Sequence, residues 1–154
     1  MENVRELFRE QGYVLFEGAL SQNELSTLRR VCDELLDEPA EDGGGNTHKI
    51  GLGEKRRFLR HRHADYPDLE DFVTGRTIGR ITTACDIQNA MLFNEQFVVK
   101  GASEGASFAW HQDGAYVGFD HTPYLTIWIA LDDATIDNGC VFILPRNIDQ
   151  KPDL

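Results

Sequence analysis

The chain has 154 residues, enough for one domain with a single hydrophobic core. Its formal net charge of -11 disfavours nucleic acid as a partner, because phosphate binding requires a basic surface. No apolar run approaches the roughly 20 residues that span a membrane, and the acidic start is unlike a signal peptide. We therefore expect a cytoplasmic protein without membrane contact, in which Cys32, Cys85 and Cys140 are reduced thiols.

The first part of the chain is expected to be helical. Residues 3–11 carry apolar side chains at helical spacing, and Gly12 is placed to end that helix. A short strand is expected over 13–16. Ser21-x-x-Glu24 is a capping box that predicts the start of a second helix. The apolar stripe of this helix consists of Leu25, Leu28, Cys32, Leu35 and Leu36.

The middle of the chain begins with a predicted loop, because Pro39 and the glycines at 43–45 cannot continue the helix. The following stretch, 55–63, is locally basic within an acidic protein. A further helix is expected after Pro67, and its apolar spacing continues to Ile81.

From residue 90 onwards the apolar period changes to two, which is typical of strands. We expect strands over 91–100, 107–111, 125–131 and 140–144. The last two would be joined through the turn Asp137-Asn138-Gly139. Helices followed by strands predict an α+β fold, mainly β in its core, in which the N-terminal helices pack on a sheet or barrel.

The most informative motif is the H-x-D pair formed by His111 and Asp113, at the point where a predicted strand meets a turn. Side chains at i and i+2 of a strand point the same way, so this imidazole and this carboxylate can hold one metal ion. Two histidines and one carboxylate form the facial triad that binds Fe(II). The alternative is a structural ion pair or hydrogen bond at a strand end, because so short a motif also occurs by chance.

A second H-x-D match, His63-Ala-Asp65, lies beside His61. Its neighbours are arginines and a tyrosine, and no apolar run next to it would shape a pocket. We interpret His61 and His63 as members of a solvated basic face rather than as metal ligands.

Several segments in a fixed order resemble one protein family. They are Gly12-Tyr-Val-Leu-Phe-Glu-Gly-Ala-Leu, Val99-Lys100, Trp110-His-Gln-Asp-Gly, Thr126-Ile-Trp-Ile-Ala-Leu-Asp-Asp and Asn138-Gly-Cys-Val-Phe-Ile-Leu-Pro145. Together they are similar to the phytanoyl-CoA dioxygenase (PhyH) family of Fe(II)/2-oxoglutarate-dependent oxygenases, over about residues 10–145. Ordered segments of this kind are far more specific than the H-x-D pair alone.

The resemblance implies a double-stranded β-helix, or jelly roll, with helices packed on one side. It implies His111 and Asp113 as the first two iron ligands, and it places Gln96, Lys100 and Trp128 near 2-oxoglutarate or substrate. The plainer interpretations of those three are a polar strand residue, a strand-end lysine and a core tryptophan. The implied reaction is hydroxylation of a small organic or acyl substrate by dioxygen, with 2-oxoglutarate converted to succinate and CO2 and ascorbate as the reductant that keeps the iron as Fe(II).

The chain departs from the family pattern after the Asn-Gly turn. The family continues Leu-Pro-Gly-Ser-His, whereas this chain reads Leu144-Pro-Arg146-Asn147-Ile148. A match for the distal histidine and for the arginine that binds 2-oxoglutarate is therefore missing. We expect 1–154 to be a single domain that lacks the C-terminal half of the barrel, binds iron weakly and turns over little.

Two residues could substitute for the missing groups. His121 could reach back to the H-x-D pair, although a solvent-facing loop histidine is the plainer interpretation. Arg146 could offer its guanidinium to a carboxylate, but it lies near the end of the chain, where anchoring is poor.

Two other functions remain open. One is a non-catalytic binding or regulatory module whose exposed sheet edges recruit a partner or a second copy. The other is a cupin-like metalloprotein of different chemistry. The sequence does not identify the substrate.

Overall fold

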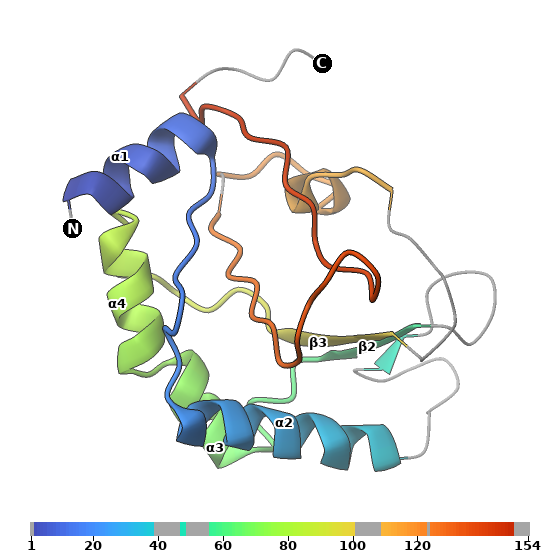
Figure 1. Ribbon diagram of the computed structural model, residues 1–154. Coiled ribbons are helices and arrows are strands. Elements are labelled where there is room, and N and C mark those ends of the chain that lie inside the picture. Colours follow the sequence, from blue (N-terminus) through green and yellow to red (C-terminus); the bar gives the residue numbers. More distant parts are fainter. Residues whose placement is uncertain (1, 39–46, 49–55, 101–108, 123, 150–154) are drawn as a thin grey trace.

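The computed structural model describes residues 2–38, 47–48, 56–100, 109–122 and 124–149. Within these ranges the chain forms four α-helices, three strands and one short 3-10 helix. The helices form an arc around a small sheet (Figure 1). This confirms the α+β class, whereas the paired strands of a jelly roll are not seen within the described residues.

Helix α1 (Glu2–Gln11) ends at Gly12, as its apolar spacing predicts. Gly12 has a φ of 75° and donates its N–H to the Phe8 carbonyl oxygen at 2.9 Å, which closes the last turn. The strand expected over 13–16 is wrong, because this segment runs as an unpaired connection to the next helix. Apolar residues become a strand only where a neighbouring strand satisfies their backbone groups.

Helix α2 (Gln22–Asp37) begins with the predicted capping box. Glu24 donates its N–H to Ser21 Oγ at 3.2 Å, and Ser21 donates its N–H to Glu24 Oε2 at 2.7 Å. Glu24 Oε1 also accepts a hydrogen bond from Thr77 Oγ1 at 2.6 Å. The Thr77 bond, followed by those of Ser21, lowers the pKa of Glu24 to about 2.

The single helix expected from Pro67 to Ile81 is two helices, α3 (Pro67–Val73) and α4 (Arg76–Ala84). Gly75, in an extended conformation, separates them. A Cβ atom at this position would collide with the Asp71 carbonyl oxygen, so the chain turns here only because the residue is glycine. Apolar spacing alone does not reveal the break.

The sheet is antiparallel in the order β1 (Thr47–His48), β2 (Arg56–Arg60) and β3 (Gln96–Lys100). From the sequence, the stretch 55–63 that contains β2 was identified only as locally basic. In the structure, Leu59 of β2 is fully buried opposite Phe97. Of the strand expected over 91–100, only the second half pairs. The arginines of β2 make its sequence look like that of an exposed stretch, although its apolar residues belong to the core.

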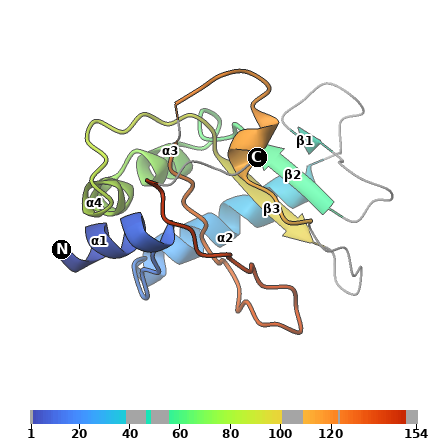
Figure 2. The ribbon, with the colours of Figure 1, turned by 90° about the horizontal axis from the view of Figure 1, so that it is seen from above.

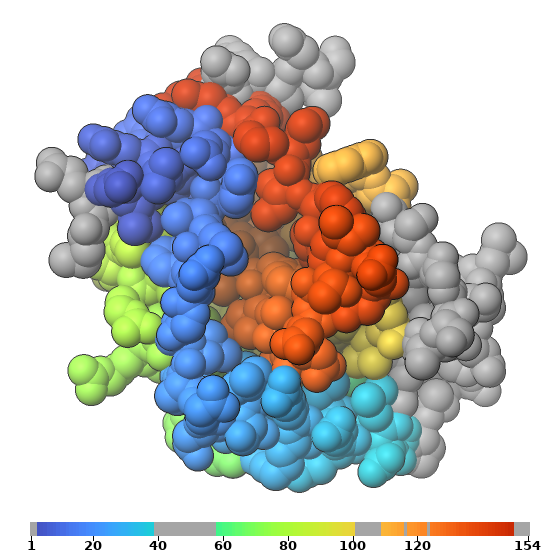
Figure 3. All heavy atoms as spheres, in the orientation of Figure 1, coloured from blue at the N-terminus to red at the C-terminus, as the bar shows by residue number. Residues whose placement is uncertain are grey.

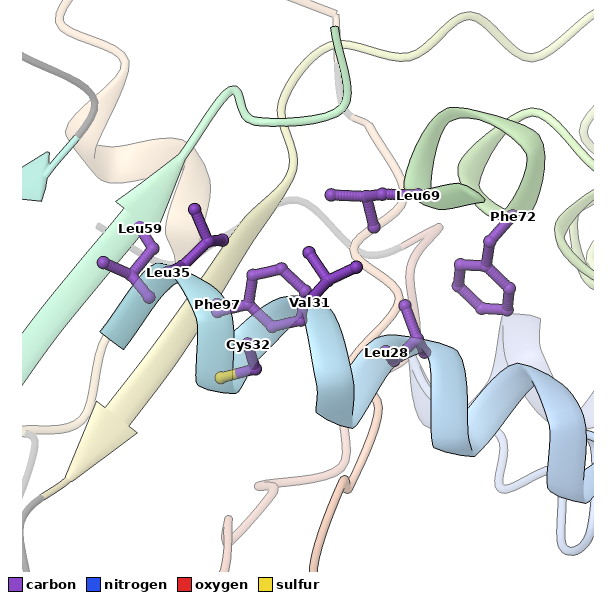
Figure 4. Packing of buried hydrophobic residues seen from close by; sticks show 8 residues of the cluster. All are labelled: Leu28, Val31, Cys32, Leu35, Leu59, Leu69, Phe72 and Phe97. Carbon is purple, nitrogen blue, oxygen red and sulfur yellow. The ribbon is translucent and has the colours of Figure 1, made fainter. Parts of the chain in front are cut away.

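The core lies between α2, α3 and one face of the sheet, and Figures 1 and 2 show the β2–β3 pair lying across α2. Its side chains come from the three elements in turn (Figure 4): Leu28, Val31, Cys32 and Leu35 from α2, Leu59 and Phe97 from the sheet, and Leu69 and Phe72 from α3. All three cysteines are free thiols; Cys32 and Cys85 are buried, and Cys140 is half-buried. Burial raises the pKa of the Cys85 thiol.

The C-terminal segment, by which we mean residues 109–149, differs from the expectation. The strands expected over 125–131 and 140–144 do not form, because neither stretch has a pairing partner within the described residues. Residues 109–111 are not a strand either, and 107–108 lie outside the described part of the chain. The predicted turn around Asn138 is present, with the Thr135 N–H donating to Asn138 Oδ1 at 2.7 Å.

The C-terminal segment rests on the rest of the molecule at a few points. Ile129 and Leu131 pack against the core, and the Leu131 carbonyl oxygen accepts a hydrogen bond from Arg29 Nε at 2.6 Å. The Arg146 N–H donates to the Gln11 carbonyl oxygen at 2.8 Å, at the end of α1. Between this segment, in red and orange, and the blue N-terminal segment, the surface is hollowed (Figure 3).

Candidate metal site

The H-x-D pair lies at the start of the C-terminal segment. A single extended residue, Gln112, separates His111 from Asp113, and a turn follows. Gln112 has φ -115° and ψ 132°, and Asp113 then begins the 3-10 helix η1 (Asp113–Tyr116). The extended Gln112 places its two neighbours on the same side of the chain. As a result, His111 Nε2 lies 3.5 Å from Asp113 Oδ1.

Each member of the pair has a second contact that fixes its orientation. His111 Nδ1 lies 2.7 Å from the Ala109 carbonyl oxygen, which can only accept a hydrogen bond, so Nδ1 is the donor in this contact. Thr126 Oγ1 donates a hydrogen bond to Asp113 Oδ2 at 2.9 Å, which leaves Oδ1 facing the imidazole. Such outer contacts commonly orient metal ligands.

The geometry and chemistry of the two donor atoms fit a metal such as Fe(II). Two ligands bound about 2.1 Å from a metal at neighbouring positions lie roughly 3 Å apart, slightly closer than this pair. The His111 and Asp113 side chains are 33% and 51% exposed, so an ion can reach them. Within the described residues, however, no group of three histidine, cysteine, aspartate or glutamate side chains stands close enough to hold a metal.

Aromatic residues and a second imidazole surround the pair. Burial, and then the nearby Asp113 carboxylate, raise the pKa of Tyr124. The Tyr124 ring contacts Phe93 at a centroid distance of 5.2 Å and His121 at 5.7 Å. His121 Nε2 lies 3.2 Å from the point where a Cβ atom of Gly114, the residue after Asp113, would stand.

Of the three residues expected near 2-oxoglutarate, Gln96 and Lys100 form hydrogen bonds with other parts of the chain, and Trp128 is exposed. Gln96 Oε1 accepts a hydrogen bond from Arg60 Nε at 2.9 Å, and Lys100 Nζ donates to the Gly139 carbonyl oxygen at 3.0 Å. Gln96 and Lys100 share the face of β3 opposite Phe97. Trp128 is exposed and is therefore not a core tryptophan.

The structure gives roles to two residues that sequence reasoning missed. Thr126 orients Asp113, and Arg60 adds a guanidinium next to Gln96. No pattern in the sequence pairs Arg60 with Gln96 or Thr126 with Asp113.

The second H-x-D match has a structural role. His63 Nδ1 lies 3.0 Å from Glu95 Oε1, and Asp65 pairs with Arg62 at 3.0 Å. His61 Nε2 lies 2.7 Å from Asn94 Oδ1. The interpretation as a wholly solvated basic face is wrong for His63, because Glu95 is almost entirely buried and draws the imidazole toward it.

An α+β domain that carries an oriented His-x-Asp pair defines a candidate metalloprotein. The family model for phytanoyl-CoA dioxygenase (PhyH) matches residues 8–153. The chain belongs to the phytanoyl-CoA dioxygenase family.

Curated relatives agree with this assignment. A phytanoyl-CoA dioxygenase of Arabidopsis thaliana is 23% identical over 175 residues, covering 91% of this chain and 62% of the relative. A phytanoyl-CoA dioxygenase domain-containing protein 1 homolog of Dictyostelium discoideum is 33% identical over 176 residues, covering 90% and 62%. A methylphosphonate hydroxylase of Gimesia maris is 27% identical over 141 residues, covering 90% and 54%.

The chain thus spans about three fifths of the length of the phytanoyl-CoA dioxygenase relatives that it matches. No solved structure matches it significantly. In the described part of the chain, no helix is long and apolar enough to cross a membrane.

Proposed function

We propose that this chain carries the metal-binding part of an Fe(II)/2-oxoglutarate-dependent dioxygenase that hydroxylates a small organic or acyl substrate. The observation that carries the proposal is the approach of His111 Nε2 to Asp113 Oδ1, with each side chain held by a further hydrogen bond. The pair lies inside the range that matches the family. When bound together, Fe(II) and 2-oxoglutarate would activate dioxygen, which is the oxidant for an otherwise unreactive C–H bond.

The residues of the pair have separate tasks in this proposal. His111 binds the metal through Nε2, because the Ala109 carbonyl oxygen holds the proton on Nδ1. Asp113 binds through Oδ1, while the Thr126 hydroxyl occupies Oδ2 and prevents rotation of the carboxylate. The ascorbate expected from the family would keep the metal reduced.

We propose that the β3 face with Gln96 and Lys100, extended by Arg60, receives the carboxylates of 2-oxoglutarate. The support is chemical, since Lys100 and Arg60 bring two cations to one face of the sheet. The exposed Trp128 would contact 2-oxoglutarate or substrate with its apolar ring.

The test compares metal binding and 2-oxoglutarate turnover in purified 1–154 and three variants. We expect His111→Ala and Asp113→Asn to bind Fe(II) at least about tenfold more weakly, since even outer-shell changes at metal sites have effects of this size. His61→Ala is the matched control, because that exposed histidine lies beside Asn94. Succinate formation, weak in the unchanged chain, should vanish in the first two variants. Equal Fe(II) affinity in all four proteins would reject the proposal.

A second candidate function is a binding or regulatory module without catalysis, and the exposed apolar side chains of the C-terminal segment favour it. Phe142 and Leu144 are 60% and 77% exposed, in a short apolar run of the kind that forms buried strands. We propose that 125–131 and 140–144 become strands of a jelly roll when further strands pair with them, including those of a second copy. Sedimentation at increasing protein concentration tests self-association, and a monomer throughout would exclude a second copy.

We also propose a cytoplasmic protein with a small-molecule substrate and with neither nucleic acid nor a membrane as partner. The net charge of -11 supports the exclusion of nucleic acid.

A further inference from the structure

Four aromatic rings lie in contact beside the turn that carries the H-x-D pair. We call them the aromatic platform: Phe93, Phe119, His121 and Tyr124. The Tyr124 ring connects the others, because it contacts Phe93 at a centroid distance of 5.2 Å and His121 at 5.7 Å. Phe119 stands edge-on to His121 at 6.2 Å. His121 in turn lies against Gly114, so the platform reaches the residue that follows the carboxylate of the pair.

The rings of the platform are open to solvent. Phe93 and Phe119 are 65% and 69% exposed, and Tyr124 is 39% exposed. Their mutual contacts are tilted or edge-on rather than stacked, so much of each ring stays accessible to a ligand. Exposed apolar side chains that gather in one place commonly mark a binding surface.

The stretch after the platform links it to Asp113 a second time. From 124 to 130 the even-numbered residues are exposed and the odd-numbered ones half-buried. Side chains that alternate in this way share one side of an extended chain. Tyr124 therefore points to the same side as Thr126, whose hydroxyl donates to Asp113 Oδ2 at 2.9 Å. A ligand on the Tyr124 ring would lie beside the candidate metal pair.

The charges around the platform favour a cationic ligand. Between Lys100 and Arg146 the sequence has no lysine or arginine, whereas Asp113 and Asp120 belong to the loop that carries the pair. A negative surface attracts cations and repels anions. The faces of aromatic rings are negative as well, and they bind ammonium groups directly. Lysine and arginine side chains occur on the β3 face, where we assign them to 2-oxoglutarate.

We propose that the aromatic platform binds a positively charged nitrogen of the substrate, either an amine or a quaternary ammonium group. The inference rests on the proposed function, because it narrows the substrate class of the same site. A small molecule with a cationic nitrogen fits the rings and the charge of this segment, whereas an acyl-CoA, with its anionic phosphates, does not. The charge of a bound Fe(II) does not reverse this preference, since Asp113 and 2-oxoglutarate offset it.

The test uses choline as probe, together with its neutral analogue, in which a tert-butyl group replaces the trimethylammonium group. Proton NMR of the methyl signal measures binding to the metal-free chain at mildly alkaline pH, because aromatic rings shift the signals of protons above their faces. We expect choline to bind more tightly than the neutral analogue. Tyr124→Leu and Phe93→Leu, which keep an apolar side chain, should each weaken choline binding by about two- to fivefold.

The matched control is Phe142→Leu, which removes an equally exposed ring outside the platform and should leave choline binding unchanged. Because the exchanged residues are not buried, denaturant midpoints should change little in all three variants. Equal binding of choline and the neutral analogue would overturn the inference. So would an unchanged choline affinity in both platform variants.

A second measurement separates the inference from the proposed function. Mn(II) bound at the pair should broaden the methyl signal of choline on the platform, because a paramagnetic ion relaxes nearby protons. We expect this broadening in the unchanged chain and in Phe142→Leu, but much less in Tyr124→Leu and in His111→Ala. Full broadening in Tyr124→Leu would overturn the inference and leave the proposed function intact. Full broadening in His111→Ala would reject the proposed function, and the inference with it.

Discussion

The molecule has two regions, the helices and sheet before residue 101 and the C-terminal segment. They differ in the burial of their apolar side chains. The buried apolar core ends with Phe97, and no described residue after it is buried. The C-terminal segment exposes many large apolar side chains, including Trp110 at 72% and Ile136 at 77%. The first region thus packs on itself, whereas the second is attached to it at a few points.

The candidate metal pair nevertheless lies in the second region. Its orientation comes from local contacts with Ala109 and Thr126 rather than from the core. A site can therefore be arranged by hydrogen bonds within a segment none of whose described residues is buried. The following predictions test this difference, in order of decreasing effect.

The largest effect is expected for matched truncations in the two regions. Leu35→Ala, at a fully buried position of α2, should reduce the free energy of unfolding by about 2–5 kcal/mol. Ile136→Ala, at 77% exposure, should change it by less than about 0.5 kcal/mol. Denaturant titrations measure both. Similar losses would show that the C-terminal segment is part of the same packed core.

The attachment of the C-terminal segment to α1 can be broken at Gly12. A Cβ atom there would stand 2.5 Å from the Arg146 carbonyl oxygen, and the φ of 75° strains any other residue. We expect Gly12→Ala to cost about 1–3 kcal/mol. The matched control is Gly79→Ala inside α4, where a Cβ atom meets nothing within 4 Å. This control should stabilise the helix by roughly 0.5–1 kcal/mol. Equal changes in the free energy of unfolding for Gly12→Ala and Gly79→Ala would refute the close contact between Gly12 and Arg146.

The capping box predicts a pH dependence confined to the first region. The pKa of Glu24 is lowered from 4.5 to about 2, so its contribution to stability is complete above about pH 4.5 and disappears as the pH falls toward 2. We expect about 1 kcal/mol or less, because solvent partly screens this carboxylate. Glu24→Gln should flatten the pH profile of the unfolding free energy between these limits. An unchanged profile would show that the carboxylate is not protonated in this range.

The smallest effect is expected from the ion pair that joins α1 to the end of the C-terminal segment. Arg9 Nη2 lies 3.0 Å from Asp149 Oδ2, and both side chains are about half exposed. A double-mutant cycle with Arg9→Ala and Asp149→Ala should give a coupling below about 1 kcal/mol, reduced further by salt. A larger, salt-insensitive coupling would make this contact a principal attachment.

Sequence reasoning was most successful where local signals decide the structure. The Ser21–Glu24 capping box and Gly12 fixed the ends of α1 and α2 correctly, because capping depends on neighbouring residues. It failed where partners distant in the sequence decide. Residues 140–144 form an apolar run typical of a strand but have no partner within the described residues, and β2 has a basic sequence but a buried centre.

The same division applies to the site. The approach of His111 and Asp113 followed from their spacing, and it survives although the expected strand does not form, because one extended residue between them is sufficient. The hydrogen bond from Thr126 and the position of His121 against Gly114 depend on how the loop folds back. The spacing of residues in the sequence does not predict how this loop folds back.

The three thiols offer a natural way to follow the two regions separately. Cys32 and Cys85 lie within the helical layer, while Cys140 is half-buried in the C-terminal segment. A thiol reagent reaches a buried cysteine only when its surroundings open, so labelling rates measure local opening. Cys140, which is half-buried, should therefore be labelled first and reports on the segment that carries the metal pair, whereas Cys32 is labelled only when the core opens. The labelling rates of these native thiols thus measure the opening of the segment that carries the site and the opening of the core, without any substitution.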